Sequence, residues 1–384
     1  MDIGFTEEQD LLRDTARKFL DSECPTTFVR QMMATETACT AESWARLAEN
    51  GWLGITYPQA DGGSGLGLTD LVVLMEEMGR AVMPGPYLAT VLLGGGAIAE
   101  AGSAAQRREY LPKIAEGSLK ATLAVTEPNA RWDAVGIMMP GREAGDGFVL
   151  SGNKMFVPDA HVADVIVVAA RTRDGSTMED GISLFAVPKT ASGLNVKLLP
   201  AIDETRKQCE VAFDNVRLPA SALLGELHQG WAPLSLVCDK AAVALAAEIC
   251  GAAQRVLDIT VDYAKLRVAF GKPIGSYQGV KHKCADMLIE IENAKSLTYY
   301  AAWALDDESA RDSGEAAQAV AMAKACASDA GRKVCAAGIQ LHGGIGMTWE
   351  HDLHLYLKRA KSCEVAFGDA TWHRERLAAL LAAA

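Results

Sequence analysis

The sequence predicts an α+β protein built from three consecutive zones, which are helical, then β, then helical again. Apolar residues recur at helical spacing up to about residue 120, and short β-rich runs fill residues 121–227. Three long Ala-rich segments follow. We therefore expect an N-terminal helical domain at 1–120, a middle β domain at 121–227 and a C-terminal helical domain at 228–384.

The first zone opens with a helix start signal. Thr6 suits an N-cap, and Gln9 stands where a side chain can bond back to the cap. Further helices are expected around Trp44–Leu47 and Leu71–Met78. The glycine-rich run Asp61–Gly67 lies between them, but it follows no strand, so we interpret it as a loop and not as a dinucleotide-binding turn.

The second zone consists of short runs rich in β-branched and aromatic residues, punctuated by Gly, Asp, Asn and Pro. No long helical pattern separates them, which favours a mostly antiparallel barrel or sandwich over βαβ units. The main runs are Phe148–Leu150, Val165–Ala170, Ile182–Val187 and Cys209–Phe213.

The third zone is dominated by long helices with apolar stripes and almost no Pro. They are expected at Trp231–Leu266, Gln278–Leu305 and Gly314–Gly338. Long helices with one apolar face usually pack as a bundle, so we expect a C-terminal four-helix-bundle domain.

Composition and charge exclude several classes of function. The 384 residues carry 37 Lys+Arg against 49 Asp+Glu, a formal net charge of −12. This balance argues against nucleic acid and anionic membranes as partners. No apolar run approaches the ~20 residues of a membrane span. Nine cysteines with no Cys-x-x-Cys pair, and a start at Met1–Gly4 unlike a signal peptide, favour a soluble cytoplasmic protein with reduced thiols.

Several motifs occur in a fixed order along the chain. A Tyr-Pro and glycine-rich stretch leads to Glu76–Gly79, and Val125-Thr126-Glu127-Pro128 and Ser151–Phe156 follow in the β zone. The helical zone adds an Arg-x-x-Phe-Gly signature with a later Gln, and then a Gln-Leu-His-Gly-Gly segment. These two are Arg267–Gln278 and Gln340–Gly346.

In the order and spacing of these motifs, the chain resembles the flavin-dependent acyl-CoA dehydrogenases over essentially its whole length. The resemblance implies FAD as cofactor and α,β-dehydrogenation of an acyl-CoA thioester, with electrons passed to an electron-transfer flavoprotein. It also implies an obligate oligomer, because some FAD contacts come from a neighbouring subunit. The FAD-binding residues it implies are Val125, Thr126, Phe156, Arg267, Phe270, Gln278, Gln340, Gly343 and Gly344.

The chemistry of these residues suits such roles. A guanidinium fork such as that of Arg267 matches the oxygens of a pyrophosphate. Phe270 offers an apolar face, and the Gly343–Gly344 pair lets backbone approach a ligand closely. The alternatives are a surface ion pair for Arg267, a core position for Phe270 and a helix stop for the glycines.

The catalytic base is where the chain departs from the family. Phe367 stands at the position of the usual Glu, and Ala241 stands where a subset of the family carries its base. Glu248 is the single charge in Ala241–Cys250, two turns along the same helix face. Burial raises the pKa of an isolated carboxyl group, so Glu248 is our candidate base. The alternatives are Asp369, a structural pairing of Glu248 with an Arg or Lys, and no base in this chain.

The empty base positions resemble a branch of the family that acts on bulky CoA thioesters such as steroid side chains. Some enzymes of that branch are heterotetramers with one competent subunit. We therefore expect either a homotetramer or an α2β2 heterotetramer with a second chain of the family. Two further departures concern FAD: Trp132 replaces a Ser that contacts the pyrophosphate, and Pro158 replaces a Thr near the flavin.

Two other features have ordinary explanations. His351 and His354 do not form the His-Glu-x-x-His pattern of a zinc helix, so we expect surface histidines and no metal. Cys284 and Cys335 are expected to be small buried apolar residues.

The sequence thus predicts an FAD-dependent acyl-CoA dehydrogenase with Glu248 as base. A non-catalytic partner subunit that completes another chain's FAD site is the main alternative. A flavin oxidase or monooxygenase on the same fold is a third possibility.

Overall fold

The computed structural model describes residues 5–173, 175–176 and 178–383, and it confirms the α+β fold. Residues Met1–Gly4, used above in the argument about a signal peptide, lie outside the described residues. Contacts divide the chain into two compact units. We call Met1–Arg30, Gly67–Met83 and Ala242–Ala384 the bundle unit, and Gln31–Leu66 and Pro84–Ala241 the sheet unit.

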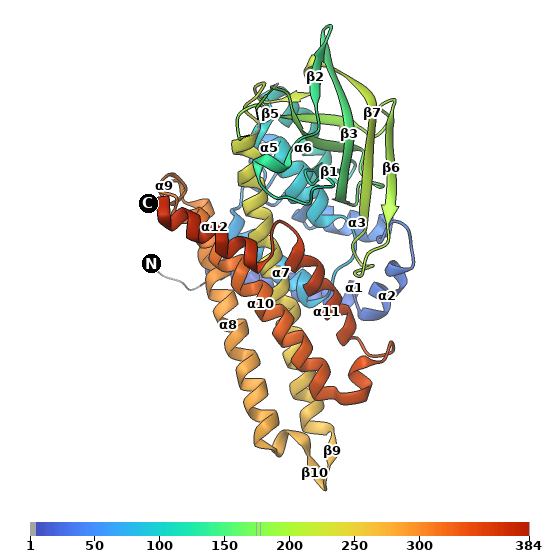
Figure 1. Ribbon diagram of the computed structural model, residues 1–384. Coiled ribbons are helices and arrows are strands. Elements are labelled where there is room, and N and C mark those ends of the chain that lie inside the picture. The colour runs from blue at the N-terminus through green and yellow to red at the C-terminus, as the bar shows by residue number, and fades with distance from the viewer. Residues whose placement is uncertain (1–4, 174, 177, 384) are drawn as a thin grey trace. The chain divides into compact units, whose positions relative to one another are not determined.

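The sheet unit contains two four-stranded sheets (Figure 1). The first has the order β1 (Ala121–Ala124), β4 (Val165–Arg171), β5 (Ile182–Pro188) and β8 (Leu223–Leu224). The second has the order β2 (Gly141–Ala144), β3 (Gly147–Pro158), β7 (Gln208–Pro219) and β6 (Leu194–Leu199). Among these strands only β1 and β4 pair in parallel, so the predicted mostly antiparallel sandwich is confirmed.

The core of the sheet unit lies between the two sheets. Leu150 and Val157 of β3 belong to the same buried apolar cluster as Ile166 and Val168 of β4. The rings of Phe148 and Phe185 lie 4.9 Å apart between their centroids. The apolar residues of these predicted runs therefore join the two sheets.

Helices complete the sheet unit, and the glycine-rich run Asp61–Gly67 is a loop after a short 3-10 turn. Tyr57 next to this run donates its hydroxyl to the Val91 carbonyl at 2.7 Å. The helices are α3 (Ala41–Glu49), the π-helix η3 (Leu88–Gly94), α5 (Gly95–Ala101), α6 (Ala104–Ala115), and the 3-10 turns η1 (Trp52–Gly54), η2 (Gln59–Asp61), η4 (Ala134–Gly136) and η5 (Ala220–Ala222). Helix α2 (Thr26–Met33) and helix α7 (Trp231–Leu266) each pass from one unit to the other.

The bundle unit is helical, and the three long predicted helices are confirmed to within a few residues. In Figure 1, α8 (Gln278–Asp306) and α10 (Glu315–His342) run side by side. The other helices are α1 (Glu7–Glu23), α4 (Leu68–Arg80), α9 (Glu308–Asp312), α11 (Leu353–Val365), α12 (Ala370–Ala383) and the 3-10 turns η6 (Ile274–Ser276) and η7 (Gly343–Met347). A two-stranded hairpin of β9 (Val268–Ala269) and β10 (Lys272–Pro273) joins α7 to α8.

The predicted start of the first helix is also confirmed. The Thr6 hydroxyl accepts from the Gln9 amide, and the Gln9 side chain accepts from the Thr6 amide, both at 3.2 Å. This reciprocal cap satisfies two amides that the helix itself leaves without partners.

Two glycines allow helices α4 and α7 to touch backbone to backbone. A Cβ on Gly79 would collide with the carbonyl of Glu248, and a Cβ on Gly251 would collide with the carbonyl of Glu76. The two helices cross so closely that neither Gly79 nor Gly251 could carry a side chain. The crossing places Glu248 in the interior of the bundle unit.

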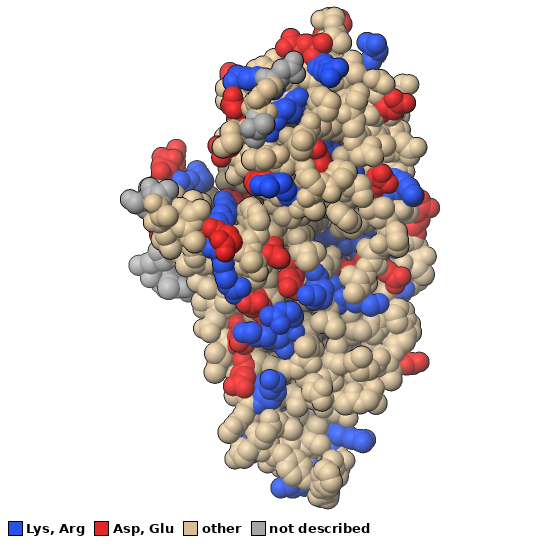
Figure 2. Space-filling model, viewed as in Figure 1, with Lys and Arg blue, Asp and Glu red and all other residues tan. Residues whose placement is uncertain are grey.

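None of the described helices combines the length and apolar character that crossing a lipid bilayer requires. Figure 2 shows acidic and basic side chains interspersed over the visible face, without a large area of one sign.

Asp306 at the end of α8 caps helix α4 from outside. Its carboxylate accepts from the amides of Leu68 and Thr69 at 2.8 and 2.9 Å. We expect Asp306→Ala to lower the free energy of unfolding by about 1–2 kcal/mol, because the first turn of α4 loses its acceptors. Urea unfolding checks this, with exposed Asp312→Ala as control, and equal stability of the two variants would contradict the capping role.

Candidate functional site

Val125 and Thr126 directly follow β1 in the sheet unit, and Phe156 lies in the adjoining part of β3. The two segments are held together by three hydrogen bonds. The Met155 amide donates to the Thr126 carbonyl at 2.8 Å, Lys154 Nζ to the Val125 carbonyl at 3.0 Å, and the Thr122 hydroxyl to the Pro158 carbonyl at 2.6 Å. The structure thus brings these three predicted flavin residues together.

A β-bulge in β3 determines which way its side chains point. Met155 and Phe156 lie between the pairs Lys154–Val211 and Val157–Cys209, so two residues of β3 oppose one residue of β7. Phe156 has a φ of 53°, which is rare for a residue with a large side chain. Its ring is 55% exposed, whereas Lys154 is fully buried.

The polar groups around Thr126 suit a ligand with hydrogen-bonding edges. Thr126 is buried, yet within the part of the chain that the structure describes its hydroxyl has no hydrogen-bond partner. The Thr126 oxygen is not among the fully buried side-chain atoms that lack a partner, so the hydroxyl keeps some access to solvent and is available to a bound molecule. The exposed ring of Phe156 provides a flat apolar surface on β3, next to this segment.

Arg267, Phe270 and Gln278 adjoin the strands β9 and β10 of the bundle unit. Figure 1 labels this hairpin. All three side chains are exposed, and Phe270 is 96% exposed at the tip with a φ of 52°. Its ring centroid lies 6.5 Å from that of Tyr277. The alternative of a core position for Phe270 is therefore wrong.

Gln340, Gly343 and Gly344 lie where α10 ends and η7 begins, and all three are exposed. A Cβ at either glycine would meet no atom of this chain within 4 Å. Tyr263 of α7 stacks on His342 with ring centroids 4.3 Å apart, so this segment packs against the end of the helix that leads to Arg267. The six bundle-unit residues are thus exposed around the ends of α7 and α10.

The familiar base positions hold no titratable group. Ala241 and Ala242 are buried in α7, and Phe367 is largely buried in the turn between α11 and α12. Phe367 has a φ of 56°. Three hydrogen bonds hold this turn: His373 Nε2 donates to the Phe367 carbonyl at 3.0 Å, and Lys324 Nζ donates to the carbonyls of Glu364 and Gly368.

Glu248 is the candidate base that the sequence singled out, and its side chain is only 1% exposed. Its carboxylate forms a buried ion pair with Arg359 of α11 and accepts from the Cys363 thiol at 3.5 Å. Arg359 also donates to the Met83 carbonyl at 3.1 Å. These contacts are the structural pairing that the sequence left open, and any catalytic role of Glu248 has to coexist with them.

Asp369, the other candidate base, is exposed at the start of α12. Its carboxylate accepts from the Trp372 amide at 2.8 Å, which is an N-cap contact. This contact gives Asp369 a structural role in the turn that carries Phe367.

The two departures near the expected FAD site lie in well-bonded segments. Pro158 ends β3 with its carbonyl bonded to Thr122, as described above. Trp132 is half-buried in a loop where Arg131 forms a bidentate ion pair with Asp133. Asp133 in turn accepts from the Gly136 amide at 3.1 Å and so starts the short turn η4.

The histidines and cysteines set aside above have ordinary surroundings. His354 Nε2 contacts the Trp349 carbonyl at 3.0 Å, and His351 Nδ1 accepts from the Leu353 amide at 3.3 Å. Within the described ranges, no group of three or more His, Cys, Asp or Glu is arranged to hold a metal ion. Cys335 is buried as expected, but Cys284 is only half-buried.

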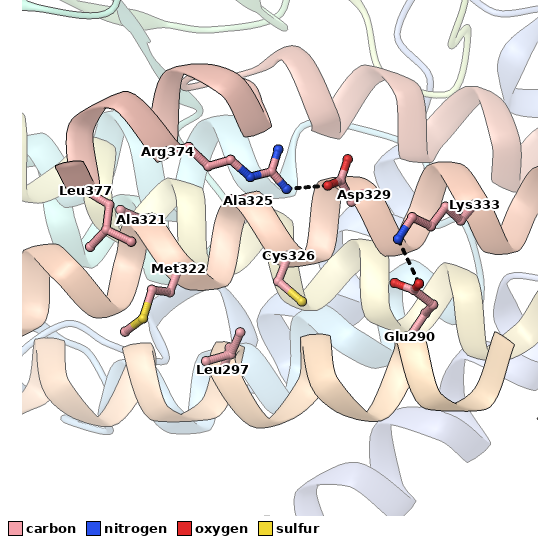
Figure 3. A pocket seen from close by; sticks show the side chains of 10 residues that line it. All are labelled: Glu290, Leu297, Ala321, Met322, Ala325, Cys326, Asp329, Lys333, Arg374 and Leu377. Carbon is pink, nitrogen blue, oxygen red and sulfur yellow. Dashed lines mark hydrogen bonds and ion pairs between the residues drawn. The ribbon is translucent and has the colours of Figure 1, made fainter. Parts of the chain in front are cut away.

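A pocket of 370 Å³ lies in the bundle unit between α8, α10 and α12 (Figure 3). Its floor is apolar and includes Leu297, Met322 and Leu377. The charged groups at its rim are paired with one another, Arg374 with Asp329 and Lys333 with Glu290. The pocket contains none of the predicted site residues.

Sequence reasoning missed the buried charges that hold these segments. Lys154 is separated from Phe148 and Leu150 by an even number of positions, so alternation along the strand places its side chain on the same, buried face. Arg359 lies on the apolar stripe of α11, with Leu355, Tyr356 and Cys363. A lone charge within an apolar stripe is the signal that could have identified both residues.

Comparison with known proteins agrees with this geometry. Residues 6–118, 122–216 and 228–382 match the N-terminal, middle and C-terminal domain models of acyl-CoA dehydrogenases. A probable acyl-CoA dehydrogenase of Bacillus subtilis, YngJ, is 31% identical over 98% of both chains. The chain belongs to the acyl-CoA dehydrogenase family.

Solved structures show the same fold. A single-substitution variant of the steroid acyl-CoA dehydrogenase Tcur3481–Tcur3483 is 33% identical with a TM-score of 0.86, over 98% of both chains. The ChsE4–ChsE5 complex from Mycobacterium tuberculosis is 26% identical with a TM-score of 0.89, over 100% of both chains. The protein is an oxidoreductase acting on CH–CH donors, and FAD is its cofactor.

A double-mutant cycle can measure the coupling between Glu248 and Arg359. Removing one partner leaves a buried uncompensated charge, so Glu248→Met or Arg359→Met should each cost about 3–5 kcal/mol of unfolding free energy. Removing both should cost much less than the sum of the two. Urea unfolding of the four proteins measures this, and additive effects of the two substitutions would contradict a coupled buried pair.

His373 makes the stability of this chain sensitive to acid. Burial, and next the neighbouring charge of Lys324, lower the pKa of His373 to about 3. The unfolded chain binds the proton at its ordinary pKa of 6.5, so stability is lost as the pH falls from 6.5 towards 3, by up to about 1.4 kcal/mol per pH unit. His373→Gln should show a shallower loss between about pH 7 and 4.5 in urea unfolding, and a slope equal to that of the unaltered protein would contradict this.

Proposed function

We propose that this chain dehydrogenates a bulky acyl-CoA thioester between Cα and Cβ in the cytoplasm and passes the electrons to an electron-transfer flavoprotein. The observation that carries the proposal is the joint placement of Val125, Thr126 and Phe156, with the Thr126 hydroxyl available to a ligand and the Phe156 ring exposed. A flavin ring has both a hydrogen-bonding edge and apolar faces, so these residues suit it. FAD, when bound, supplies the acceptor for the two electrons and the hydrogen that leave Cβ.

The proposed FAD contacts fall into one group in the sheet unit and another group in the bundle unit. Thr126 would bond the polar edge of the flavin, and Phe156 would contact its face. Arg267 would pair with the pyrophosphate, and Phe270 would cover an apolar part of the dinucleotide. The bundle-unit residues of the site are Arg267, Phe270, Gln278, Gln340, Gly343 and Gly344, and their exposure supports a site completed by a second chain.

The oligomer is part of the proposal. Large apolar side chains are exposed around the same ends of the bundle, including Leu266, Val268 and Met347. Such exposure is unusual for a monomer and supports burial against another subunit. We propose a homotetramer or an α2β2 heterotetramer. The similarity to the ChsE4–ChsE5 complex and to a steroid acyl-CoA dehydrogenase supports the heteromer and a steroid side-chain substrate.

Glu248 is the proposed base for the Cα proton. It is the single charged residue between Ala241 and Cys250, but it can accept a proton from substrate only if the ion pair with Arg359 opens. A proton taken up by Glu248 neutralises the carboxylate and leaves the buried Arg359 guanidinium without its counter-charge, so this step carries part of the cost of breaking a buried ion pair.

A second function is favoured by two specific observations. The carboxylate of Glu248 already pairs with Arg359, and the usual base position holds Phe367. A chain with no available base would be a non-catalytic partner subunit whose Arg267, Gln278 and Gln340 complete the FAD site of another chain.

Activity and flavin content of Glu248→Gln separate the two functions. If Glu248 is the base, the variant keeps the FAD of the unaltered protein but loses at least ~100-fold in dehydrogenation rate, the usual scale of general-base catalysis. Turnover of butyryl-CoA and of a steroid side-chain CoA thioester, with ferrocenium as acceptor, measures the rate. Glu77→Gln is the matched control, since Glu77 is also buried and paired with an arginine, Arg17, at 2.6 Å.

Unchanged turnover by Glu248→Gln would contradict its role as base. The visible absorption spectrum of the chain purified alone gives the second measurement. Flavin bands near one FAD per chain support the self-contained enzyme, whereas a colourless folded protein that gains flavin only with a second family member supports the partner subunit. Consumption of O₂ without an external acceptor would indicate an oxidase.

A further inference from the structure

We propose that Lys154 is a positioning residue for FAD: its buried ammonium group fixes the backbone of Val125 and Thr126 in the geometry that binds the flavin. This inference rests on the proposed function and adds to it a residue that does not touch the cofactor. It follows from three features of the sheet unit, which are the contacts of Lys154, its burial and the bulge next to it.

The contacts of Lys154 connect β3 to the segment after β1. Its Nζ donates to the Val125 carbonyl at 3.0 Å and to Glu127 Oε1 at 2.7 Å. Glu127 Oε1 also accepts from the amides of Met138 and Met139, at 3.0 and 2.9 Å. One ammonium and one carboxylate oxygen therefore hold three pieces of backbone that belong to no common strand.

Burial makes this connection stiff. Lys154 is fully buried and the side chain of Glu127 is only 7% exposed. Burial lowers the pKa of Lys154, and the charge of Glu127 partly offsets that effect. An ammonium without solvent depends on its protein acceptors, so moving the Val125 carbonyl away would leave a buried charge short of a partner. The carbonyl is thus held more firmly than an exposed loop would be.

The bulge in β3 places the buried Lys154 close to the exposed residues that we expect to contact the flavin. Lys154 points inward, the next amide, that of Met155, donates to the Thr126 carbonyl, and the following ring, that of Phe156, is exposed. The carbonyls of Val125 and Thr126 are both engaged by β3, which leaves the Thr126 hydroxyl for a ligand. Displacing Lys154 would therefore disturb both the hydroxyl and the ring with which we expect the flavin to make contact.

FAD binding to the deflavinated full-length protein tests the proposal. Loss of a hydrogen bond from a charged group should raise the Kd of Lys154→Met for FAD by about 10- to 100-fold, measured by quenching of flavin fluorescence. Lys154→Arg, which keeps a buried donor and charge, should restore part of the affinity. Lys324→Met is the matched control, because Lys324 is equally buried and also bonds backbone carbonyls, but lies in the bundle unit.

A double variant separates positioning from stability. Lys154→Met with Glu127→Gln removes both charges and keeps an oxygen for the Met138 and Met139 amides, so it should recover stability in urea unfolding. Its FAD affinity should stay low, because no group then holds the Val125 carbonyl. Recovery of affinity together with stability, or an unaltered Kd in Lys154→Met, would overturn the proposal and leave the proposed function intact. Failure of the unaltered protein to bind FAD would overturn the proposed cofactor site and this inference with it.

Discussion

The bundle unit depends on one buried ion pair, that of Glu248 and Arg359. Two glycines bring α4 and α7 into backbone contact at the carbonyl of Glu248, and Arg359 of α11 binds both the Glu248 carboxylate and the Met83 carbonyl, which lies just after the end of α4. Three helices are therefore fixed by one guanidinium. A buried arginine has several donors in a rigid fork, so satisfying it specifies the relative positions of its partners more narrowly than apolar packing does.

The sheet unit uses the same principle with a lysine. Lys154 and Glu127 hold the segment after β1 against the bulge of β3, in the place where the family resemblance expects the flavin. In both units a buried charge organises irregular backbone that regular hydrogen bonding cannot fix. Two bulky residues with positive φ lie beside such groups: Phe156 is close to the contacts of Lys154, and Phe367 lies in the turn held by Lys324 and His373.

The remaining residues that we expect to contact FAD are exposed and, within the described part of the chain, are not held by buried charges. Arg267, Phe270 and Gln278 are exposed, and Phe270 has almost its whole ring in solvent. An exposed aromatic ring such as that of Phe270 adds little to the folding free energy of a single chain, because an aromatic ring stabilises a protein when it is buried. These exposed side chains of the bundle unit are the ones that we propose to be covered by FAD and a second chain.

The sequence by itself determined the order of the elements and the ends of the long helices. Local periodicity sets which face of a helix is apolar, so Trp231–Leu266 could be predicted closely, and continuous apolar runs predicted β4 and β5 closely. In β3 the predicted run Phe148–Leu150 is only the first part of the strand Gly147–Pro158. The family motifs likewise identified Val125, Thr126 and Phe156, which the structure brings together. Tertiary structure alone decided the partners of isolated charges. Glu248 was conspicuous in the sequence, but its pairing with Arg359 joins positions 111 residues apart, and Lys154 reaches Val125 across two sheets. The partner of a buried charge depends on how the helices and sheets pack against one another. The local sequence pattern, which predicts single helices and strands, does not predict that packing.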